Sequence, residues 1–270
     1  MARTLWLLSH IFALTLHVQG HYLASLMPAI ASLLPRHMKD TGAAPQVKEL
    51  STKTPPPFLE YYNSVFDALG PQHWWPARTP FEVIVGAILT QSTAWANVEK
   101  AVANLRQSQL LSPGAMERVP LRRLARLVRP SGYFRQKSKK LKAFVRFLRE
   151  EYGGSLARMF GTPTAELREK LLAVHGIGRE TADSILLYAG AHPIFVVDAY
   201  TKRILLRHGW VGAKAGYEEM RELVERNFPR DVARYNELHA LLVQVGKNWC
   251  RPREARCTEC PLGRFLENGR

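Results

Sequence analysis

The chain has 270 residues, of which 46% are hydrophobic and 23% charged, and this composition excludes a disordered protein because a hydrophobic core can form. Its formal net charge of +15 favours a polyanionic partner, above all nucleic acid, although a merely basic or membrane-facing surface stays open. The three cysteines lie close together near the C-terminus, and this odd, tight cluster indicates a metal site in a reducing compartment instead of a disulfide scaffold.

Residues 1–57 are expected to form an apolar leader and a linker, neither of them essential. Leu5–Val18 resembles a signal-peptide core, but histidines interrupt it and no clean cleavage site of small residues follows. We therefore expect a nonessential leader, or a later start at Met27 or Met38, in preference to secretion. The run Pro55–Pro57 is typical of a linker.

From Phe58 onward, apolar residues recur at helical spacing almost throughout. The clearest predicted helices are Pro80–Leu105, Pro120–Val128, Ser138–Tyr152, Thr164–Ala173 and Glu180–Ala189. Pairs of glycine and proline separate them. Only Ile194–Val197 has weak strand character. The sequence thus predicts an all-α protein with many short helices.

The most diagnostic segment is 171–183, which combines a helix, a Gly-x-Gly turn and a second helix. Gly176 and Gly178 can adopt positive φ, so the chain can reverse sharply and bring backbone N–H groups close to a phosphate. The free N–H groups at the start of the second helix point the same way. The alternative is an ordinary helical hairpin with a glycine cap.

Asp198 follows Ala182 by sixteen residues and opens the next predicted helix. A plain N-cap is one interpretation, and a cap can also hold a carboxylate at the mouth of a cleft. The order of hairpin, helix, Gly/Pro-containing loop and Asp resembles the signature of the helix-hairpin-helix DNA glycosylase superfamily. That resemblance implies that the hairpin holds a DNA strand and that Asp198 is the catalytic carboxylate facing the extruded nucleotide.

The resemblance covers about residues 58–262 and is broadly to the endonuclease III family. It implies an all-α, two-lobed fold that binds double-stranded, damaged DNA between the lobes and flips a base out of the stack. A narrower resemblance, to the 3-methyladenine DNA glycosylase branch, implies release of an alkylated purine. The motifs that carry it are Trp74-Trp75-Pro76, Thr90-Gln91-Ser92-Thr93, Arg129-Pro130-Ser131-Gly132-Tyr133, Gln136-Lys137 and Gly176 to Asp183.

Glu180 departs from the pattern of the bifunctional family members, which carry Lys at this hairpin position. A carboxylate cannot form the Schiff base that leads to strand cleavage, so Glu180 implies a monofunctional glycosylase in which water attacks the sugar. One alternative is a bifunctional endonuclease III acting on oxidised pyrimidines, with Lys202 as a substitute nucleophile. A second alternative is a noncatalytic DNA-binding module that uses the hairpin alone.

The resemblance assigns further residues to the base pocket and to DNA contacts. An N-alkylated purine is cationic and leaves readily, so Asp198 has two candidate roles, to stabilise the oxocarbenium-like sugar and to activate water. Trp74, Trp75 and Trp95 are candidate pocket walls, with core packing as the alternative. Gln91 is a candidate wedge or a surface-turn residue. The remaining candidate DNA contacts are Gly176, Gly178, Arg179, Thr181 and Lys137. Lys137 belongs to a basic run formed by Arg129, Arg135, Lys137, Lys139 and Lys140, and the alternative for this run is a solvated helix face.

Cys250, Cys257 and Cys260 match three positions of the family's iron–sulfur motif, whose fourth position is Leu266 here. A 4Fe–4S cluster usually takes four thiolates. Ligation by three cysteines with water or another side chain, zinc with a histidine, and a site that binds no metal are the alternatives.

We therefore divide the chain into residues 1–57, a glycosylase core over 58–249 with its hairpin at 171–183, and a cysteine-containing loop over 250–270. We expect a cytoplasmic, nucleoid-associated monomer that does not bind membranes.

Overall fold

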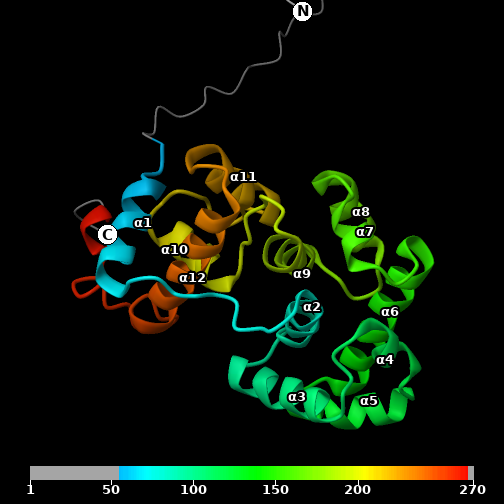
Figure 1. Cartoon of the computed structure of the whole chain (residues 1–270). Coiled ribbons are helices and arrows are strands. Elements are labelled where there is room, and N and C mark those ends of the chain that lie inside the picture. Colours follow the sequence, from blue (N-terminus) through cyan, green and yellow to red (C-terminus); the bar gives the residue numbers. More distant parts are fainter. Residues whose placement is uncertain (1–54, 267–270) are drawn as a thin grey trace, which may run out of the picture. The chain divides into compact units, whose positions relative to one another are not determined.

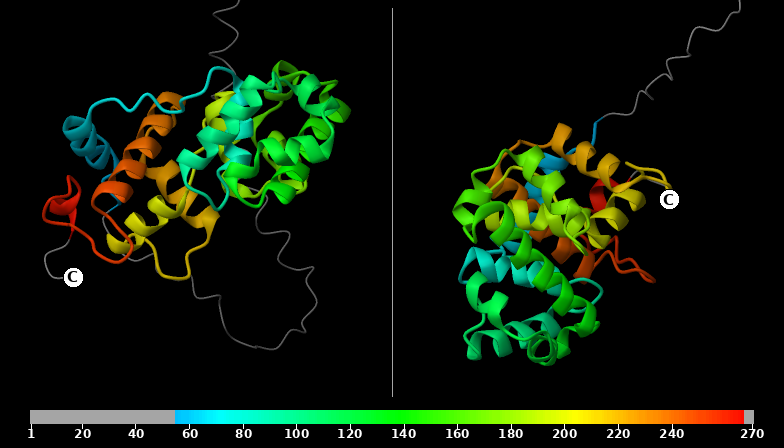
Figure 2. Two further views of the ribbon diagram at one scale, coloured as in Figure 1. Left: turned by 90° about the horizontal axis from the view of Figure 1, so that it is seen from below. Right: turned by 90° about the vertical axis from the view of Figure 1, so that its right-hand side faces the viewer.

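The computed structural model describes residues 55–266, and in that range it contains helices and no strand (Figures 1 and 2). The predicted leader and most of the linker, residues 1–54, lie outside the described residues. No helix in the described range is long and apolar enough to cross a membrane. The α-helices are α1 (Phe58–Leu69), α2 (Pro80–Leu89), α3 (Trp95–Gln107), α4 (Pro113–Arg118), α5 (Leu121–Leu127), α6 (Phe134–Tyr152), α7 (Leu156–Phe160), α8 (Thr164–Ala173), α9 (Arg179–Ser184), α10 (Ala199–Arg207), α11 (Tyr217–Asn227) and α12 (Val232–Asn248).

The helices form two lobes. In one lobe α12 packs against α1 and α10, so the first and last helices of the described chain lie together (Figure 1). In the other lobe α6 packs against α2, α4, α5 and α7. The π-helix Ile185–Ala189, which continues α9 directly, contacts both α2 and α12 and so joins the lobes. This arrangement confirms the predicted all-α, two-lobed fold.

α2 is the central helix of the second lobe because every residue after its first proline is buried. The side chain of Thr79 caps it by accepting a hydrogen bond from the backbone N–H of Glu82 at 3.2 Å, and Pro80 occupies the first turn, as predicted. The predicted single helix over 80–105 is wrong, since α2 ends at Leu89 and a turn precedes α3. Ser92 in that turn has a φ of 54°, which no α-helix accommodates.

The weak strand expected at Ile194–Val197 is also absent from the described chain. These four residues are buried, but they lie beside helices and have no strand to pair with. Two of their backbone N–H groups donate to side chains instead: Phe195 donates to Glu225 at 2.9 Å and Val197 donates to the Tyr217 hydroxyl at 3.4 Å. Side chains from α11 thus replace a β-ladder and hold the segment that leads to Asp198.

A buried ion pair joins the two helices of the hairpin. The carboxylate of Asp183 on α9 is fully buried and accepts two hydrogen bonds from Arg168 on α8, at 2.7 and 3.1 Å. The hydroxyl of Tyr217 on α11 donates a third bond to Asp183 at 2.8 Å. Burial raises the pKa of Asp183, while Arg168 and Tyr217 oppose that shift by stabilising its ionised form.

Asp183→Asn should lower the free energy of unfolding by about 3 kcal/mol, because it removes the buried counter-charge of Arg168 and leaves that guanidinium only the partly exposed carboxylate of Glu218. Urea unfolding followed by circular dichroism measures the change. The matched control is Asp67→Asn on the exposed face of α1, where the same substitution should change stability by less than about 0.5 kcal/mol. Equal losses in the two variants would contradict a structural role for the pair.

Candidate active site

The predicted hairpin is present, with α8 ending at Ala173 and α9 beginning at Arg179. Gly176 has a φ of 84°, a conformation that residues with side chains rarely adopt. Gly178 is extended, with φ of −93° and ψ of 178°, so the expectation that both glycines take positive φ is correct for Gly176 alone. A Cβ atom at Gly178 would meet no protein atom within 4 Å, so the backbone there faces open space.

Gln91 holds this turn from the segment after α2. Its side-chain amide donates to the carbonyl oxygen of Gly176 at 3.0 Å and to Oγ1 of Thr181 at 2.9 Å. Lys140 Nζ in turn donates to the Gln91 side-chain oxygen. Gln91 therefore lies beside the hairpin, and its polar atoms are engaged within the protein. A role as a DNA wedge stays a prediction.

The candidate DNA contacts on α9 differ in exposure. The side chain of Arg179 is 61% exposed and pairs with Glu218 at 3.0 Å. Thr181 is 6% exposed and its hydroxyl accepts the bond from Gln91, so its side chain is not available at the surface. The first helical hydrogen bond of α9 is donated by Ala182 to Gly178, which leaves the preceding backbone N–H groups of the first turn for an external acceptor.

Lys137 requires a correction. It is 2% exposed, and its ammonium donates to the carbonyl oxygens of Leu89 at 2.9 Å and Ser131 at 2.5 Å. Burial, with a smaller effect from Lys140, lowers its pKa to about 8. Lys137 thus ties the end of α2 to a neighbouring turn and cannot reach a DNA phosphate in this conformation. Other cations of the basic run, including Arg129, Arg135 and Lys139, are exposed.

The three candidate pocket tryptophans converge. Trp74 and Trp75 lie in the irregular segment between α1 and α2, and Trp95 opens α3. The ring centres of Trp75 and Trp95 are 5.1 Å apart, and those of Trp74 and Trp95 are 6.0 Å apart. Tyr188 of the π-helix lies 5.2 Å from Trp75. These three tryptophans line one open cavity of about 660 Å³, and Gln91 lines it as well.

Asp198 lines the same cavity and also caps a helix. Its Oδ1 atom accepts the backbone N–H of Thr201 at 2.7 Å at the start of α10. Its Oδ2 atom lies 3.8 Å from Nε2 of His239 on α12. Burial lowers the pKa of His239, so the ring stays neutral near pH 7, and its Nε2 atom has no hydrogen-bond partner within the described chain. The cap thus leaves one carboxylate oxygen facing the cavity.

Glu180 is a second carboxylate in this cavity. Its side chain remains in contact with solvent, yet the surrounding protein displaces much of its water, and the charge of Asp198 adds to this effect. Together they raise its pKa to about 7. Glu180 is therefore about half protonated at neutral pH, which makes it a proton donor of suitable strength.

A lysine does line the cavity, but it is not the one suggested by the sequence. Lys247 near the end of α12 lies with its ammonium 5.8 Å from the ring centre of Trp74. Lys202, the proposed substitute nucleophile, is exposed on α10 and does not contribute to the cavity wall.

Comparison with known proteins decides the family. Residues 85–230 match the HhH-GPD superfamily of base excision DNA repair proteins, where HhH stands for helix-hairpin-helix. The chain belongs to this superfamily. It is therefore a DNA repair glycosylase, as the hairpin and Asp198 predicted.

Individual relatives agree with this membership. The chain is 46% identical over 206 residues to a Methanocaldococcus jannaschii protein named "Putative DNA repair glycosylase MJ1434", with 76% of this chain and 93% of that protein covered. It is 31% identical to endonuclease III of Thermotoga maritima, over 70% of this chain and 81% of the relative.

Two solved structures are similar to this HhH-GPD chain. One is the 3-methyladenine DNA glycosylase of H. pylori bound to 1,N6-ethenoadenine, with a TM-score of 0.62, 27% identity, and 70% and 97% of the two chains covered. The other is an endonuclease III–DNA complex with a TM-score of 0.66 and 22% identity, covering 77% of this chain and 94% of that one. The second likeness establishes the fold only.

The cavity residues of this glycosylase that were not found from its sequence include Tyr217, His239 and Lys247. They come from two separate helices, and none stands in a recognisable motif. The spacing of His239 and Lys247 in one helical run would have placed them near one face, but only packing of α12 against the π-helix brings that face to Asp198.

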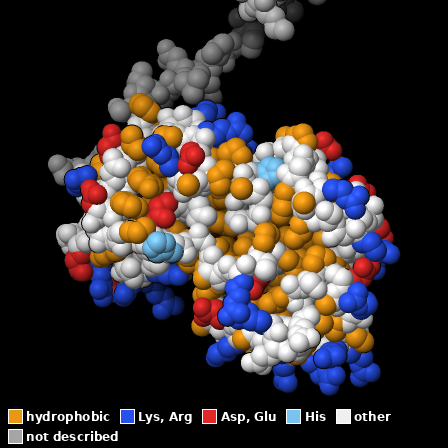
Figure 3. Space-filling model, viewed as in Figure 1, with side chains coloured by type: hydrophobic (Ala, Val, Ile, Leu, Met, Phe, Trp, Pro, Cys, Tyr) orange, Lys and Arg blue, Asp and Glu red, His pale blue; other side chains and the backbone are white. Residues whose placement is uncertain are grey.

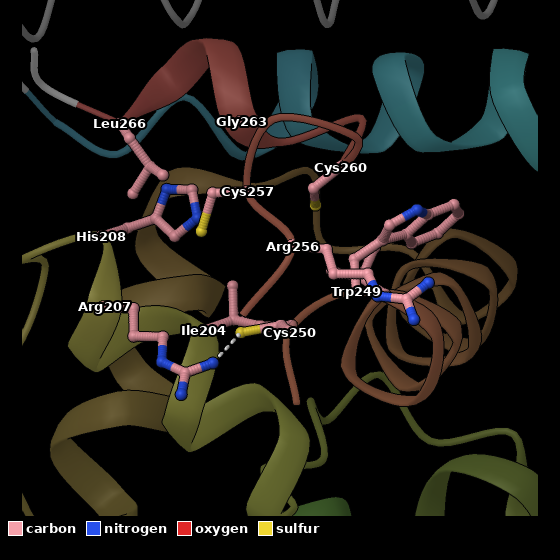
Figure 4. Close-up of a pocket in the computed structure, with 11 residues that line it drawn as sticks. Ile204, Arg207, His208, Trp249, Cys250, Arg256, Cys257, Cys260, Gly263 and Leu266 are labelled. Carbon is pink, nitrogen blue, oxygen red and sulfur yellow. Dashed lines mark hydrogen bonds between the residues drawn. The ribbon is translucent and has the colours of Figure 1, made fainter. Parts of the chain in front are cut away.

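The three cysteines of this HhH-GPD protein line a second, smaller cavity of about 20 Å³ (Figure 4). Their side chains lie on different sides of it, and Leu266 lines it as well. Arg207 on α10 donates to Cys250 Sγ at 3.2 Å. Within residues 55–266 no group of three His, Cys, Asp or Glu side chains is arranged to hold a single metal ion.

The donors nevertheless fit a polynuclear cluster. A single ion needs all of its ligands within about 2.5 Å of one point. A 4Fe–4S cluster takes one ligand on each of four separate irons, so thiolates on different sides of a cavity are what it requires. Cys250, Cys257 and Cys260 would hold three irons of such a cluster, which stabilises the loop that carries them.

The two hairpin glycines allow DNA binding to be separated from folding. Gly178→Ala should weaken binding to an abasic-site duplex at least about tenfold, because the new methyl group faces the space where a phosphate would approach. Its stability should fall by about 1 kcal/mol or less, the usual loss at a helix N-cap. Fluorescence anisotropy and thermal melting measure the two effects.

Gly176→Ala is the comparison for that variant. Its methyl group would clash with the aliphatic part of the Lys140 side chain at a positive φ, so this change should reduce stability more than Gly178→Ala does. Parent-like DNA affinity in a folded Gly178→Ala protein would contradict phosphate binding at this turn.

Proposed function

We propose that this enzyme is a monofunctional glycosylase that releases an alkylated purine, such as 3-methyladenine, from double-stranded DNA. The observation that carries the proposal is a cavity with tryptophan walls that contains Asp198 and, at the hairpin position where a bifunctional enzyme has Lys, Glu180. A carboxylate at that position removes the amine needed for a Schiff base.

The cavity walls suit a flat, electron-poor base. Trp75 and Trp95 meet edge to face, so a planar ring can stack on an indole face beside them. An N-alkylated purine is cationic, and a cation over an indole gains an attraction that the undamaged base lacks. The likeness to the 3-methyladenine glycosylase of H. pylori, crystallised with 1,N6-ethenoadenine, supports a purine substrate.

Asp198 is proposed to act on the sugar. Because Oδ1 is engaged by the N–H of Thr201, the carboxylate has a fixed orientation, and Oδ2 is left to face the flipped nucleotide. Positive charge develops on the sugar ring as the glycosidic bond breaks, and the carboxylate stabilises it. The same oxygen can then accept a proton from the attacking water.

The wider surface supports a polyanionic partner such as DNA. Figure 3 shows Lys and Arg side chains gathered at the lower edge of this face, over α3 and α5. We propose residues 58–249 as the glycosylase core and 250–270 as an accessory loop, in a protein that acts as a monomer near the nucleoid.

Glu180 favours a second candidate substrate class. A cationic purine leaves without protonation, whereas a neutral damaged base, such as an oxidised or deaminated pyrimidine, leaves more easily when an acid donates a proton. A carboxyl group with a pKa of about 7 in the same cavity could supply that proton.

Asp198→Asn should slow base release at least about 100-fold without loss of DNA binding, because Asn keeps the helix cap but not the charge. The matched control is Asp231→Asn, which changes an exposed N-cap with the same geometry, 2.8 Å from the N–H of Arg234, outside the cavity. Release of 3-methyladenine by the Asp198 variant at the parent rate would contradict the catalytic assignment. Single-turnover assays measure the rate.

Borohydride trapping tests the monofunctional assignment, and no covalent protein–DNA adduct is expected. Should one form, the bifunctional alternative is favoured. Lys247→Ala and Lys202→Ala would then identify the nucleophile, with Lys247 favoured by its position in the cavity wall.

Glu180→Gln separates the two substrate classes when base release is measured over a damage panel. Release of cationic 3-methyladenine should be unaffected and independent of pH near 7. Release of a neutral base should fall as pH rises through about 7, since the acid form of Glu180 is lost there, and the variant should be slow at every pH. Slow release of both bases by the variant would contradict the prediction that only neutral bases need a proton from Glu180.

A further inference from the structure

We propose that His208 is the fourth protein ligand of an iron–sulfur cluster held by Cys250, Cys257 and Cys260, in place of the cysteine that the family motif would have at Leu266. Ligation by His208 does not depend on which base the enzyme releases.

His208 lies beside Leu266, on the side of the cysteine cavity where the family motif would have its fourth cysteine. It follows the last residue of α10 and lines the same cavity as the three cysteines and Leu266. Figure 4 shows its imidazole between Leu266 and Cys257, with one edge turned toward the cavity. The ring therefore occupies the place beside Leu266 where the motif would bring a fourth sulfur.

The two ring nitrogens of His208 have different surroundings. Nδ1 lies 2.5 Å from the hydroxyl of Tyr61, which is buried and also accepts the indole N–H of Trp210 at 2.9 Å. Nε2 makes no hydrogen bond to any described residue. A metal-bound histidine typically coordinates through one nitrogen while a hydrogen bond from the other orients the ring. Nε2 is thus the proposed ligating atom, which requires the tautomer in which Nδ1–H donates to the Tyr61 hydroxyl.

The remaining chemistry of the cavity is compatible with this ligand set. Histidine is an established ligand for iron in one class of iron–sulfur centre, where it replaces cysteine. The guanidinium of Arg207, which donates to Cys250, offsets negative charge from the three thiolates. Leu266 cannot bind iron, but its side chain covers this corner of the cavity.

Another side chain is less suitable. Glu259, a carboxylate within the cysteine loop, is 62% exposed, lies 3.9 Å from Arg256 and does not line the cavity. His208 also differs from the cysteines in its origin, because it directly follows α10 and does not belong to the loop. Coordination would bind the loop to the helix that begins at Asp198.

The test uses the full chain, reconstituted anaerobically with ferrous iron and sulfide and labelled with nitrogen-15 histidine. Iron and sulfide analysis should give about four of each per chain. After reduction with dithionite, pulsed electron paramagnetic resonance should detect hyperfine coupling from one histidine nitrogen. His208→Cys should retain the cluster and lose this coupling, while His175→Ala, at an exposed histidine in the hairpin turn, should keep it.

A second pair of variants distinguishes loss of the fourth ligand from loss of the fold. In His208→Ala, one-electron oxidation by ferricyanide should release the unliganded iron as Fe²⁺ and leave a paramagnetic 3Fe–4S cluster. Adding Leu266→Cys to that variant should restore four irons that survive the same oxidation. Thermal melting checks that each variant folds.

Three results would overturn the proposal: no cluster in the parent chain, a cluster without histidine coupling, or coupling that persists in His208→Cys. Each readout is spectroscopic, so it is distinguishable from failure of base release.

Discussion

The carboxylate of Asp183 links the hairpin to the segment that carries Asp198. It accepts hydrogen bonds from Arg168 on α8 and from the hydroxyl of Tyr217 on α11, and that hydroxyl also accepts the backbone N–H of Val197. One continuous network therefore runs from the second hairpin helix to the residue before Asp198. Because an unpaired charge in the interior is strongly unfavourable, the network resists rearrangement. The hairpin turn and Asp198 are thereby held in a fixed relation.

The chain as a whole is strongly basic, but the tryptophan-lined cavity contains two carboxylates. In the proposed reaction these charges serve different steps. The long-range positive field would attract DNA, whereas a negative charge near the sugar would favour the positively charged transition state. Two ionised carboxylates in one cavity would repel each other, and the raised pKa of Glu180 is in part the response to Asp198. Protonation of Glu180 relieves this repulsion.

α10 connects the two cavities of the molecule. Its N-terminus is capped by Asp198, and the residue after its C-terminus, His208, lines the cysteine cavity. Between them, Arg203 and Arg207 donate to the backbone carbonyl oxygens of Cys250 and Pro252, at 2.6 and 3.0 Å. A cluster in that cavity would therefore stabilise the helix that orients Asp198, although it lies outside the base pocket.

The sequence by itself determined the features that depend on local chemistry: the helices from apolar periodicity, the hairpin from its glycines, and Asp198 from its place at a helix start. Only the tertiary structure decided which polar groups reach the surface or the cavity. Lys137 was predicted to contact DNA, but it is buried and its ammonium donates to the carbonyl oxygen of Leu89. His239 and Lys247 line the cavity, although no sequence motif indicated them. The reason is physical, since a residue's neighbours along one helix follow from spacing, whereas its burial and partners follow from how distant helices pack.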